Sequence, residues 1–224
     1  MLKTFLKKLG YRWKRFRKSL KKKQYEAEYQ AKLADLKQLI SLHKGNFIDL
    51  YFADESGFNM EGYIPYGWQP KGKYIEITPA KTKGTQIFGL MSFNNDLESY
   101  AIKGSMNSRV VIAFLDDFKS RIKRPTAVVI DNAPIHHSKE FEAKIQQWKE
   151  EDFYIFFLPK YSPHLNPIEI LWRMIKYHWL QYEELESQVE LDIQLEKILC
   201  SFGSKYTINF KELGNQIKVS NIYS

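Results

Sequence analysis

The chain has 224 residues, enough to build one substantial hydrophobic core. With 44% apolar, 15% aromatic and 27% charged residues, its composition is that of a folded globular protein and excludes a disordered one. The single cysteine, Cys200, excludes an internal disulfide and a zinc site built from cysteines, and fits a reducing cytoplasm. No apolar run approaches the roughly 20 residues that a membrane span needs, so we expect no membrane partner.

The positive charge of the chain is concentrated near its N-terminus. Residues 1–44 hold 14 Lys and Arg against 3 Asp and Glu, a net charge of +11, whereas the rest holds 20 against 23, a net of −3. A solvated lysine-rich helix is one explanation of this segment. Its interleaved Tyr11, Trp13 and Phe16 favour contact with a nucleic-acid backbone instead, with an anionic membrane surface as the second choice. The expected contact residues are Arg12, Lys14, Arg15, Arg17, Lys18, Lys21, Lys22 and Lys23.

The first half of the chain predicts helices followed by an antiparallel meander. Apolar residues at helical spacing predict a short helix that stops at Gly10 and a second one from about Gln24 to His43. From Phe47 the apolar period changes to two, which is typical of strands. The expected strands are "FIDLYFA", "YIEIT", "TQIFGLMSF" and "LESYAIKG".

The second half alternates helices with two apolar strands. Residues 107–122 predict a helix with Val110, Phe114 and Phe118 on its apolar side, and a later helix is capped by Ser138. The segments "AVVID" and "FYIFFL" are almost wholly apolar, as buried parallel strands are. This order predicts an α/β fold with a mixed sheet and helices on its faces.

Three carboxylates occupy equivalent places in this predicted sheet. Asp54 ends the first strand, Asp131 ends "AVVID", and Glu169 enters the helix that follows "FYIFFL". Ligand sites gather at the carboxyl ends of strands in open sheets, so the three side chains could share a pocket. Each also has a simpler explanation. Aspartate favours turns at strand ends, and Glu169 could complete a capping box behind Asn166 and Pro167 or pair with Arg173 one turn on.

The segment "LPKYSPHLNPIE" favours a metal-binding role for Glu169. Its prolines stiffen the path into the helix, and Mg²⁺ requires ligands that are held rigidly. The helix buries a stripe that includes Ile168 and Trp172, which leaves Glu169 at its edge. Without metal, repulsion among the three acids should raise at least one of their pKa values. On that argument Asp131→Asn leaves the metal-free protein at least as stable as the parent.

The blocks "YFADESGF", "VVIDNAPIHHS" and "FLPKYSPHLNPIEILW" resemble the signature blocks of mariner-like transposases of bacterial insertion sequences. These belong to the DDE transposase and retroviral integrase superfamily, and the resemblance covers nearly all of the chain from about Leu9. It implies a ribonuclease-H-like fold: a mixed five-stranded sheet with helices on both faces, preceded by a basic helical arm. It also implies that Asp54, Asp131 and Glu169 are the catalytic residues and hold two Mg²⁺ or Mn²⁺ ions.

The implied reaction is cleavage of phosphodiester bonds at the ends of a DNA element and joining of those ends to target DNA. DNA is the implied partner, with a homodimer as the active form in the bacterial cytoplasm, associated with the nucleoid when bound. Asn132, His136 and Glu55 could support the three acids. His136 could equally be solvated, Asn132 could shape its turn, and Glu55 should point to the opposite face of its strand. Arg173 and Lys176 complete the expected DNA contacts.

The expected domains are a basic helical arm at residues 1–45, a catalytic domain at 46–182 and a helical extension at 183–224. Family members usually begin with helix-turn-helix modules, of which "FLKKLGYRWKR" resembles only the last helix. We therefore expect a catalytic half, either the product of a split reading frame that works with an upstream helix-turn-helix polypeptide or a truncated relic. The alternatives are a catalytically silent DNA-binding or regulatory remnant and a ribonuclease-H-like nuclease without strand transfer.

Overall fold

A mixed five-stranded sheet forms the centre of the computed structural model, which describes residues 4–5, 8, 26–60, 84–181 and 185–210. In space the strands follow the order β3-β2-β1-β4-β5. The pairs β1–β2 and β2–β3 are antiparallel, whereas β1–β4 and β4–β5 are parallel. The strands are β1 (Asp49–Phe58), β2 (Thr85–Ser92), β3 (Leu97–Lys103), β4 (Thr126–Ile130) and β5 (Phe153–Phe157).

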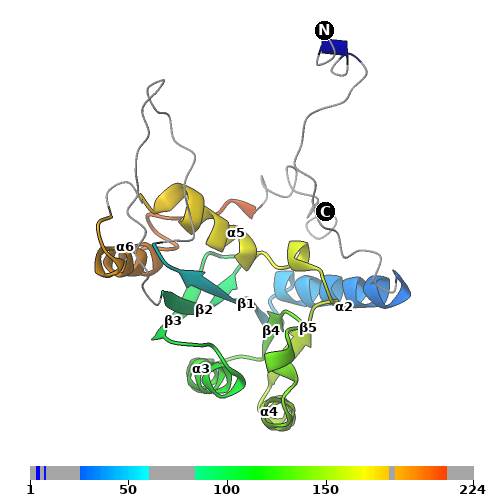
Figure 1. Cartoon of the computed structure of the whole chain (residues 1–224). Helices are drawn as coiled ribbons and strands as arrows, with labels where there is room; N and C mark the ends of the chain where they lie inside the picture. The colour runs from blue at the N-terminus through cyan, green and yellow to red at the C-terminus, as the bar shows by residue number, and fades with distance from the viewer. Residues whose placement is uncertain (1–3, 6–7, 9–25, 61–83, 182–184, 211–224) are drawn as a thin grey trace.

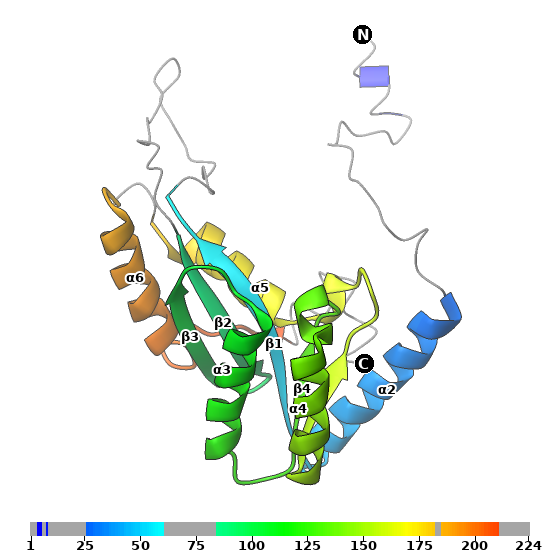
Figure 2. The same ribbon diagram turned by 60° about the horizontal axis from the view of Figure 1, so that its bottom comes forward.

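Helices cover both faces of this sheet, as predicted (Figures 1 and 2). One face packs against α3 (Ser108–Arg121) and α4 (Lys139–Glu150). The other packs against α2 (Glu26–Lys44), α5 (Ile168–Met174) and α6 (Gln188–Cys200). Short helical turns join these elements: η2 (Pro134–His137), η3 (Pro163–Leu165) and the π-helical turn η4 (Ile175–Trp179), which continues α5.

The predicted helix starts are largely confirmed. The Ser138 hydroxyl accepts a hydrogen bond from the backbone N–H of Phe141 at 3.2 Å, and Asn107 caps α3 in the same way. The fully buried residues of α3 are Val111, Leu115 and Phe118, so the predicted stripe was wrong at Val110, whereas Phe114 packs partly buried against the same cluster. Phe114 stacks on Tyr100 of β3 and on Phe88 of β2, with ring centroids 4.6 Å and 6.0 Å apart.

Two strands differ from their predictions. β1 runs on to Phe58, beyond the expected end at Asp54, because β2 continues to pair with it as far as Thr85. β5 is parallel to β4 as expected, but it lies at the edge of the sheet, and Phe153 is its one fully buried residue. The expected strand "YIEIT" lies outside the described residues.

Helix α2 belongs to the folded core. Leu36 and Ile40 are buried in the same cluster as residues of α5 and α6, so the second half of residues 1–45 packs on the sheet. In the part of the chain that the structure describes, no helix is long and apolar enough to cross a membrane.

Candidate active site

Asp54 lies in the middle of β1, where the sheet changes character. The parallel pairing of β1 with β4 ends at Phe52 and Val129, while the antiparallel pairing with β2 continues and places Asp54 opposite Gly89. The prediction that Asp54 ends its strand was therefore wrong: β1 continues beyond it, and Asp54 lies just past the last residue that pairs with β4. It still faces the carboxyl end of β4, which is why it meets the acid that follows that strand.

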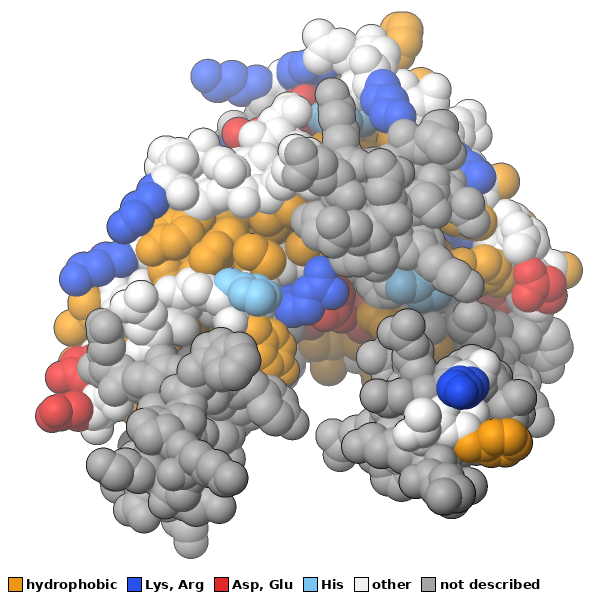
Figure 3. Space-filling model, turned by 90° about the horizontal axis from the view of Figure 1, so that it is seen from above, with side chains coloured by type: hydrophobic (Ala, Val, Ile, Leu, Met, Phe, Trp, Pro, Cys, Tyr) orange, Lys and Arg blue, Asp and Glu red, His pale blue; other side chains and the backbone are white. Residues whose placement is uncertain are grey.

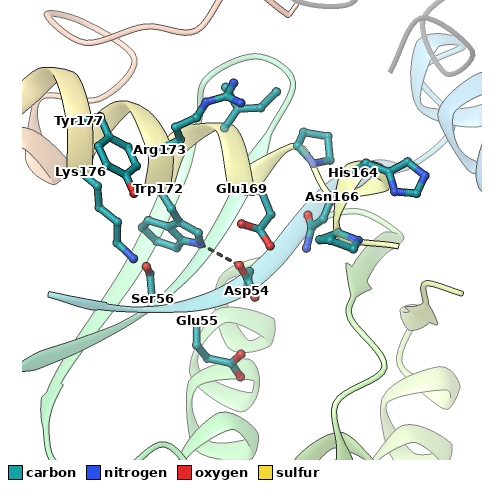
Figure 4. Close-up of a pocket in the computed structure, with 13 residues that line it drawn as sticks. Asp54, Glu55, Ser56, His164, Asn166, Glu169, Trp172, Arg173, Lys176 and Tyr177 are labelled. Atoms are coloured by element: carbon teal, nitrogen blue, oxygen red, sulfur yellow. Dashed lines mark hydrogen bonds between the residues drawn. The ribbon is translucent and has the colours of Figure 1, made fainter. Parts of the chain in front are cut away.

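The three predicted acids surround a common space. Asp131 follows β4 directly, and Glu169 is the second residue of α5. Together with Asp54 they line a cavity of about 650 Å³. An adjoining cavity of about 630 Å³ is lined by Asp54 of β1 and by Glu169, Arg173 and Lys176 of α5 and η4 (Figure 4). Figure 3 views the molecule from above, and acidic side chains lie near the centre of that view, beside Lys or Arg and histidine side chains.

Asp54 is partly buried beneath α5 and is held there by Trp172. The indole Nε1–H of Trp172 donates to Asp54 Oδ2 at 3.0 Å. Room for the indole comes from Gly89, since a Cβ at that position would lie 2.8 Å from Trp172 Cη2. Burial raises the pKa of Asp54 well above its ordinary value, and the charges of Glu169, Glu55 and Asp131 raise it further.

Glu169 is exposed on the wall of this space. The loss of solvent around its carboxyl group raises its pKa. The positive charges of Lys176 and Arg173 oppose this rise, and the negative charge of Asp131 adds to it. The capping-box explanation of Glu169 was wrong: α5 begins at Ile168, and Pro167 precedes it without a side-chain cap. Asn166 instead donates its Nδ2–H to the carbonyl of Ala53 at 3.0 Å, which ties the start of α5 to β1 beside Asp54.

Asp131 has a different electrostatic environment. Its Oδ1 accepts the backbone N–H of Ala133 at 3.1 Å and lies 3.3 Å from Nε2 of His136. Burial alone would raise the pKa of Asp131, but His136, the Ala133 N–H and His137 together hold this pKa below its ordinary value. The native state therefore favours the ionised form of this carboxylate.

The structure brings two of the three supporting candidates close to Asp131. His136 is completely buried, so the solvated alternative was wrong. Its Nε2 also lies 3.5 Å from Glu55 Oε1, and Glu55 points to the opposite side of β1 from Asp54, as predicted (Figure 4). Asn132 does not bond to the Asp131 side chain. Its Nδ2–H donates to the Leu158 carbonyl at 3.4 Å and joins the loops that follow β4 and β5.

Of the predicted DNA contacts, Arg173 and Lys176 lie at the cavity, and those between Arg12 and Lys23 fall outside the described residues. Sequence reasoning missed the polar and aromatic residues that complete the two cavities. These lining residues are Lys160, Tyr161, His164 and Tyr177. It also missed the bond from Trp172 to Asp54, because Trp172 belongs to the predicted buried stripe. Only its spacing of three residues from Glu169 indicates a place near the site.

Within the described part of the chain, no three His, Cys, Asp or Glu side chains are gathered into a ready-made metal-binding group. Asp54, Asp131 and Glu169 stand around the cavity instead. Such an arrangement leaves space for water and substrate beside any cation, which a closed structural site does not.

A family model described as a DDE superfamily endonuclease matches residues 49–192, well over half of the chain. The chain belongs to the DDE superfamily of endonucleases. The matched segment of this DDE endonuclease contains Asp54, Asp131 and Glu169.

Comparison with known proteins agrees with this membership and with the predicted resemblance. An uncharacterized 39 kDa protein of insertion element IS630 from Shigella sonnei is 26% identical over 131 residues. That match covers 56% of this chain but only 37% of the relative, so the chain spans little more than a third of that protein.

Solved structures of Mos1 transposase have the same fold. The Mos1 strand transfer complex matches with a TM-score of 0.63 at 16% identity, covering 99% of this chain and 65% of the Mos1 chain. The isolated catalytic domain of Mos1 mariner transposase gives 0.53 at 12% identity, covering 84% of this chain and 86% of that domain. Mos1 paired end complexes solved with Mn and with Mg also match, at 0.60 and 0.63 with 15% and 16% identity, each over 89% of this chain and 62% of the Mos1 chain. The predicted ribonuclease-H-like fold is thus confirmed.

Proposed function

We propose that this DDE endonuclease is the catalytic domain of a metal-dependent DNA transposase, with Asp54, Asp131 and Glu169 as its catalytic metal ligands. The observation that carries the proposal is that three carboxylates from separate segments line one open cavity. Membership of the DDE superfamily and the fold shared with Mos1 transposase support the same reading.

The residues at the cavity fit a hard divalent cation. Carboxylate oxygens are the ligands that Mg²⁺ and Mn²⁺ prefer. The raised pKa of Asp54, caused by burial and by its acidic neighbours, reflects a concentration of negative charge that a cation would offset. When bound, two such ions supply activation of the attacking oxygen and stabilisation of the leaving oxygen in phosphodiester cleavage.

The remaining residues of the site would bind and orient the DNA strand. Arg173 and Lys176 line the cavity beside Glu169 and offer positive charge to backbone phosphates. The Lys176 ammonium group lies 5.1 Å from the centre of the Phe58 ring, which restrains it near the acids. The basic residues from Arg12 to Lys23 would add non-specific affinity along the duplex.

The partners follow from the same proposal. The substrates would be the ends of a DNA element and its target DNA, the active form would be a homodimer, and an upstream helix-turn-helix polypeptide would supply recognition of the ends. A catalytically silent regulatory remnant is the less favoured alternative, because all three acids are present and face one cavity.

Incubation of the full chain with labelled element-end DNA and Mg²⁺ or Mn²⁺ tests this function. The reaction is run with and without the upstream polypeptide. We expect cleaved and joined products with the parent protein and none with Asp54→Asn or Glu169→Gln. Asp117→Asn, which alters an exposed carboxylate bonded to Tyr100, is the matched control and should keep full activity. Binding without cleavage under every condition would favour the silent remnant, and cleavage without joining would favour the nuclease.

A further inference from the structure

The two aspartates of the site are each approached through one carboxylate oxygen by a buried ring nitrogen, and the two rings lie on opposite faces of the sheet. We propose that Trp172 and His136 are positioning residues that fix Asp54 and Asp131 in the orientation that a divalent cation requires. This inference rests on the proposed function, and it assigns roles to residues that do not themselves contact metal or DNA.

On the α5 face, Trp172 fixes Asp54. The indole is 3% exposed and is packed against Gly89 of β2 and across Phe58 of β1, with the two ring centroids 6.1 Å apart. Its Nε1–H donates to Asp54 Oδ2 at 3.0 Å (Figure 4). Because the indole is enclosed by protein on several sides, it holds the Asp54 carboxylate at one rotation.

On the α3 and α4 face, His136 fixes Asp131. The imidazole is fully buried, and its ring lies 5.5 Å from the ring of Phe141, so its orientation is set by packing. Its Nε2 stands 3.3 Å from Asp131 Oδ1 and 3.5 Å from Glu55 Oε1, which links the loop after β4 to β1. Within the described structure, neither ring nitrogen of His136 has a hydrogen-bond partner that meets the usual geometry. Nε2 is therefore available to the Asp131 carboxylate, which lies 3.3 Å away.

The backbone acts on the same oxygen of Asp131. The N–H of Ala133 donates to Oδ1 at 3.1 Å, so Oδ1 is contacted from two sides. These two contacts fix the rotation of the Asp131 carboxylate.

Groups that orient metal ligands have a measurable effect on affinity. Removing such an outer partner typically weakens metal binding by about 10–100-fold, because the ligand must then lose rotational freedom when the ion binds. A group with a purely structural role lowers the stability of the fold without this selective loss of affinity.

Calorimetric titration of the full-length chain with Mn²⁺ alone tests the inference. We expect Trp172→Phe and His136→Leu each to weaken Mn²⁺ binding by about 10–100-fold. His136→Gln, whose amide nitrogen can donate to Asp131, should recover most of the loss. Trp148→Phe is the matched control, because Trp148 Nε1 donates to Asp116 Oδ1 at 2.8 Å outside the site, and its Mn²⁺ affinity should equal that of the parent. If His136→Leu does not fold, His136→Met replaces it.

The outcomes separate the two proposals. Parental Mn²⁺ affinity in Trp172→Phe and in the apolar His136 variant would overturn the positioning role and leave the proposed function standing. Equal weakening by Trp148→Phe would also overturn it, since a general loss of packing would then be the cause. A parent chain that binds no Mn²⁺ would overturn both the metal site of the proposed function and this inference.

Discussion

Three carboxylates that look alike in the sequence differ in their surroundings. Burial and acidic neighbours raise the pKa of Asp54, and the loss of solvent around its carboxyl group raises the pKa of Glu169. The contact of Asp131 with His136 lowers the pKa of Asp131 below its ordinary value. The pKa of Asp54 rises as expected, but burial contributes more to this rise than the repulsion from Glu169, Glu55 and Asp131 does. For Asp131 the effect of His136 and of the Ala133 N–H outweighs that of burial, so we now expect Asp131→Asn to lower the stability of the metal-free protein.

We predict that Asp54→Asn stabilises the metal-free protein at neutral pH. The folded-state pKa of Asp54 lies above its unfolded value, so the folded state binds more protons. The contribution of the protonated group to the stability is fully present below the unfolded pKa of about 3.9. It is lost as the pH rises through the folded-state pKa. Urea unfolding in EDTA from pH 4 to pH 8 should show the variant gaining on the parent as the pH rises. Parallel curves would contradict a charged, crowded Asp54.

Asp131→Asn should have the opposite effect. Its folded-state pKa is lowered, so its contribution to stability is present above the unfolded pKa and is lost as the pH falls through the folded pKa. In the same unfolding series without metal, the variant should be less stable than the parent at pH 7 and should approach it near pH 3. A variant as stable as the parent at pH 7 would mean that the contacts with His136 and Ala133 contribute nothing.

At the scale of elements, the site depends on how α5 is seated on the two central strands. Asp54 and Gly89 are paired across β1 and β2, and the absence of a side chain at Gly89 lets Trp172 reach Asp54. Asn166 ties the start of α5 to Ala53, one residue before Asp54. The position of Glu169 therefore follows from contacts on both sides of it.

We predict that Gly89→Ala costs about 1–3 kcal/mol of unfolding free energy, because a Cβ would lie 2.8 Å from Trp172 and overpack the core. Combining it with Trp172→Phe, which removes the clashing atoms, should give a smaller loss than the sum of the two single variants. Denaturant titration of the three variants measures this coupling. Strict additivity would show that the indole and Gly89 are not in contact.

At the scale of the whole molecule, the excess of basic residues near the N-terminus lies in a different stretch of sequence from the helix that packs on the core. Residues 1–25 contain 11 Lys and Arg and no Asp or Glu, whereas residues 26–44 contain three of each. Helix α2, in the second of these stretches, buries Leu36 and Ile40 in the core. The basic charge can therefore be removed without cutting into that helix.

We predict that deleting residues 1–25 removes most of the non-specific DNA affinity of the chain. If about six of its cations contact phosphates, log affinity should fall with log salt at a slope near −5 for the parent and much less steeply for the deletion. Fluorescence anisotropy with a duplex at several salt concentrations measures both. Unchanged affinity and slope would place DNA binding elsewhere, and the unfolding curve of the deletion should match that of the parent as a control.

Local patterns in the sequence determined much of this protein. A mixed sheet and a shared acidic site could be predicted from the sequence. The features used were the apolar run of β4, the cap at Ser138 and the blocks around Asp54, Asp131 and Glu169, and each of these features is local to a short stretch of the chain. The tertiary structure alone decided the length of β1, the face that α3 buries and the edge position of β5. It also decided which ring nitrogen lies against each aspartate. Trp172 and Asp54 are far apart in sequence and meet because Gly89, paired with Asp54 on β2, leaves room for the indole. No local period encodes such a contact.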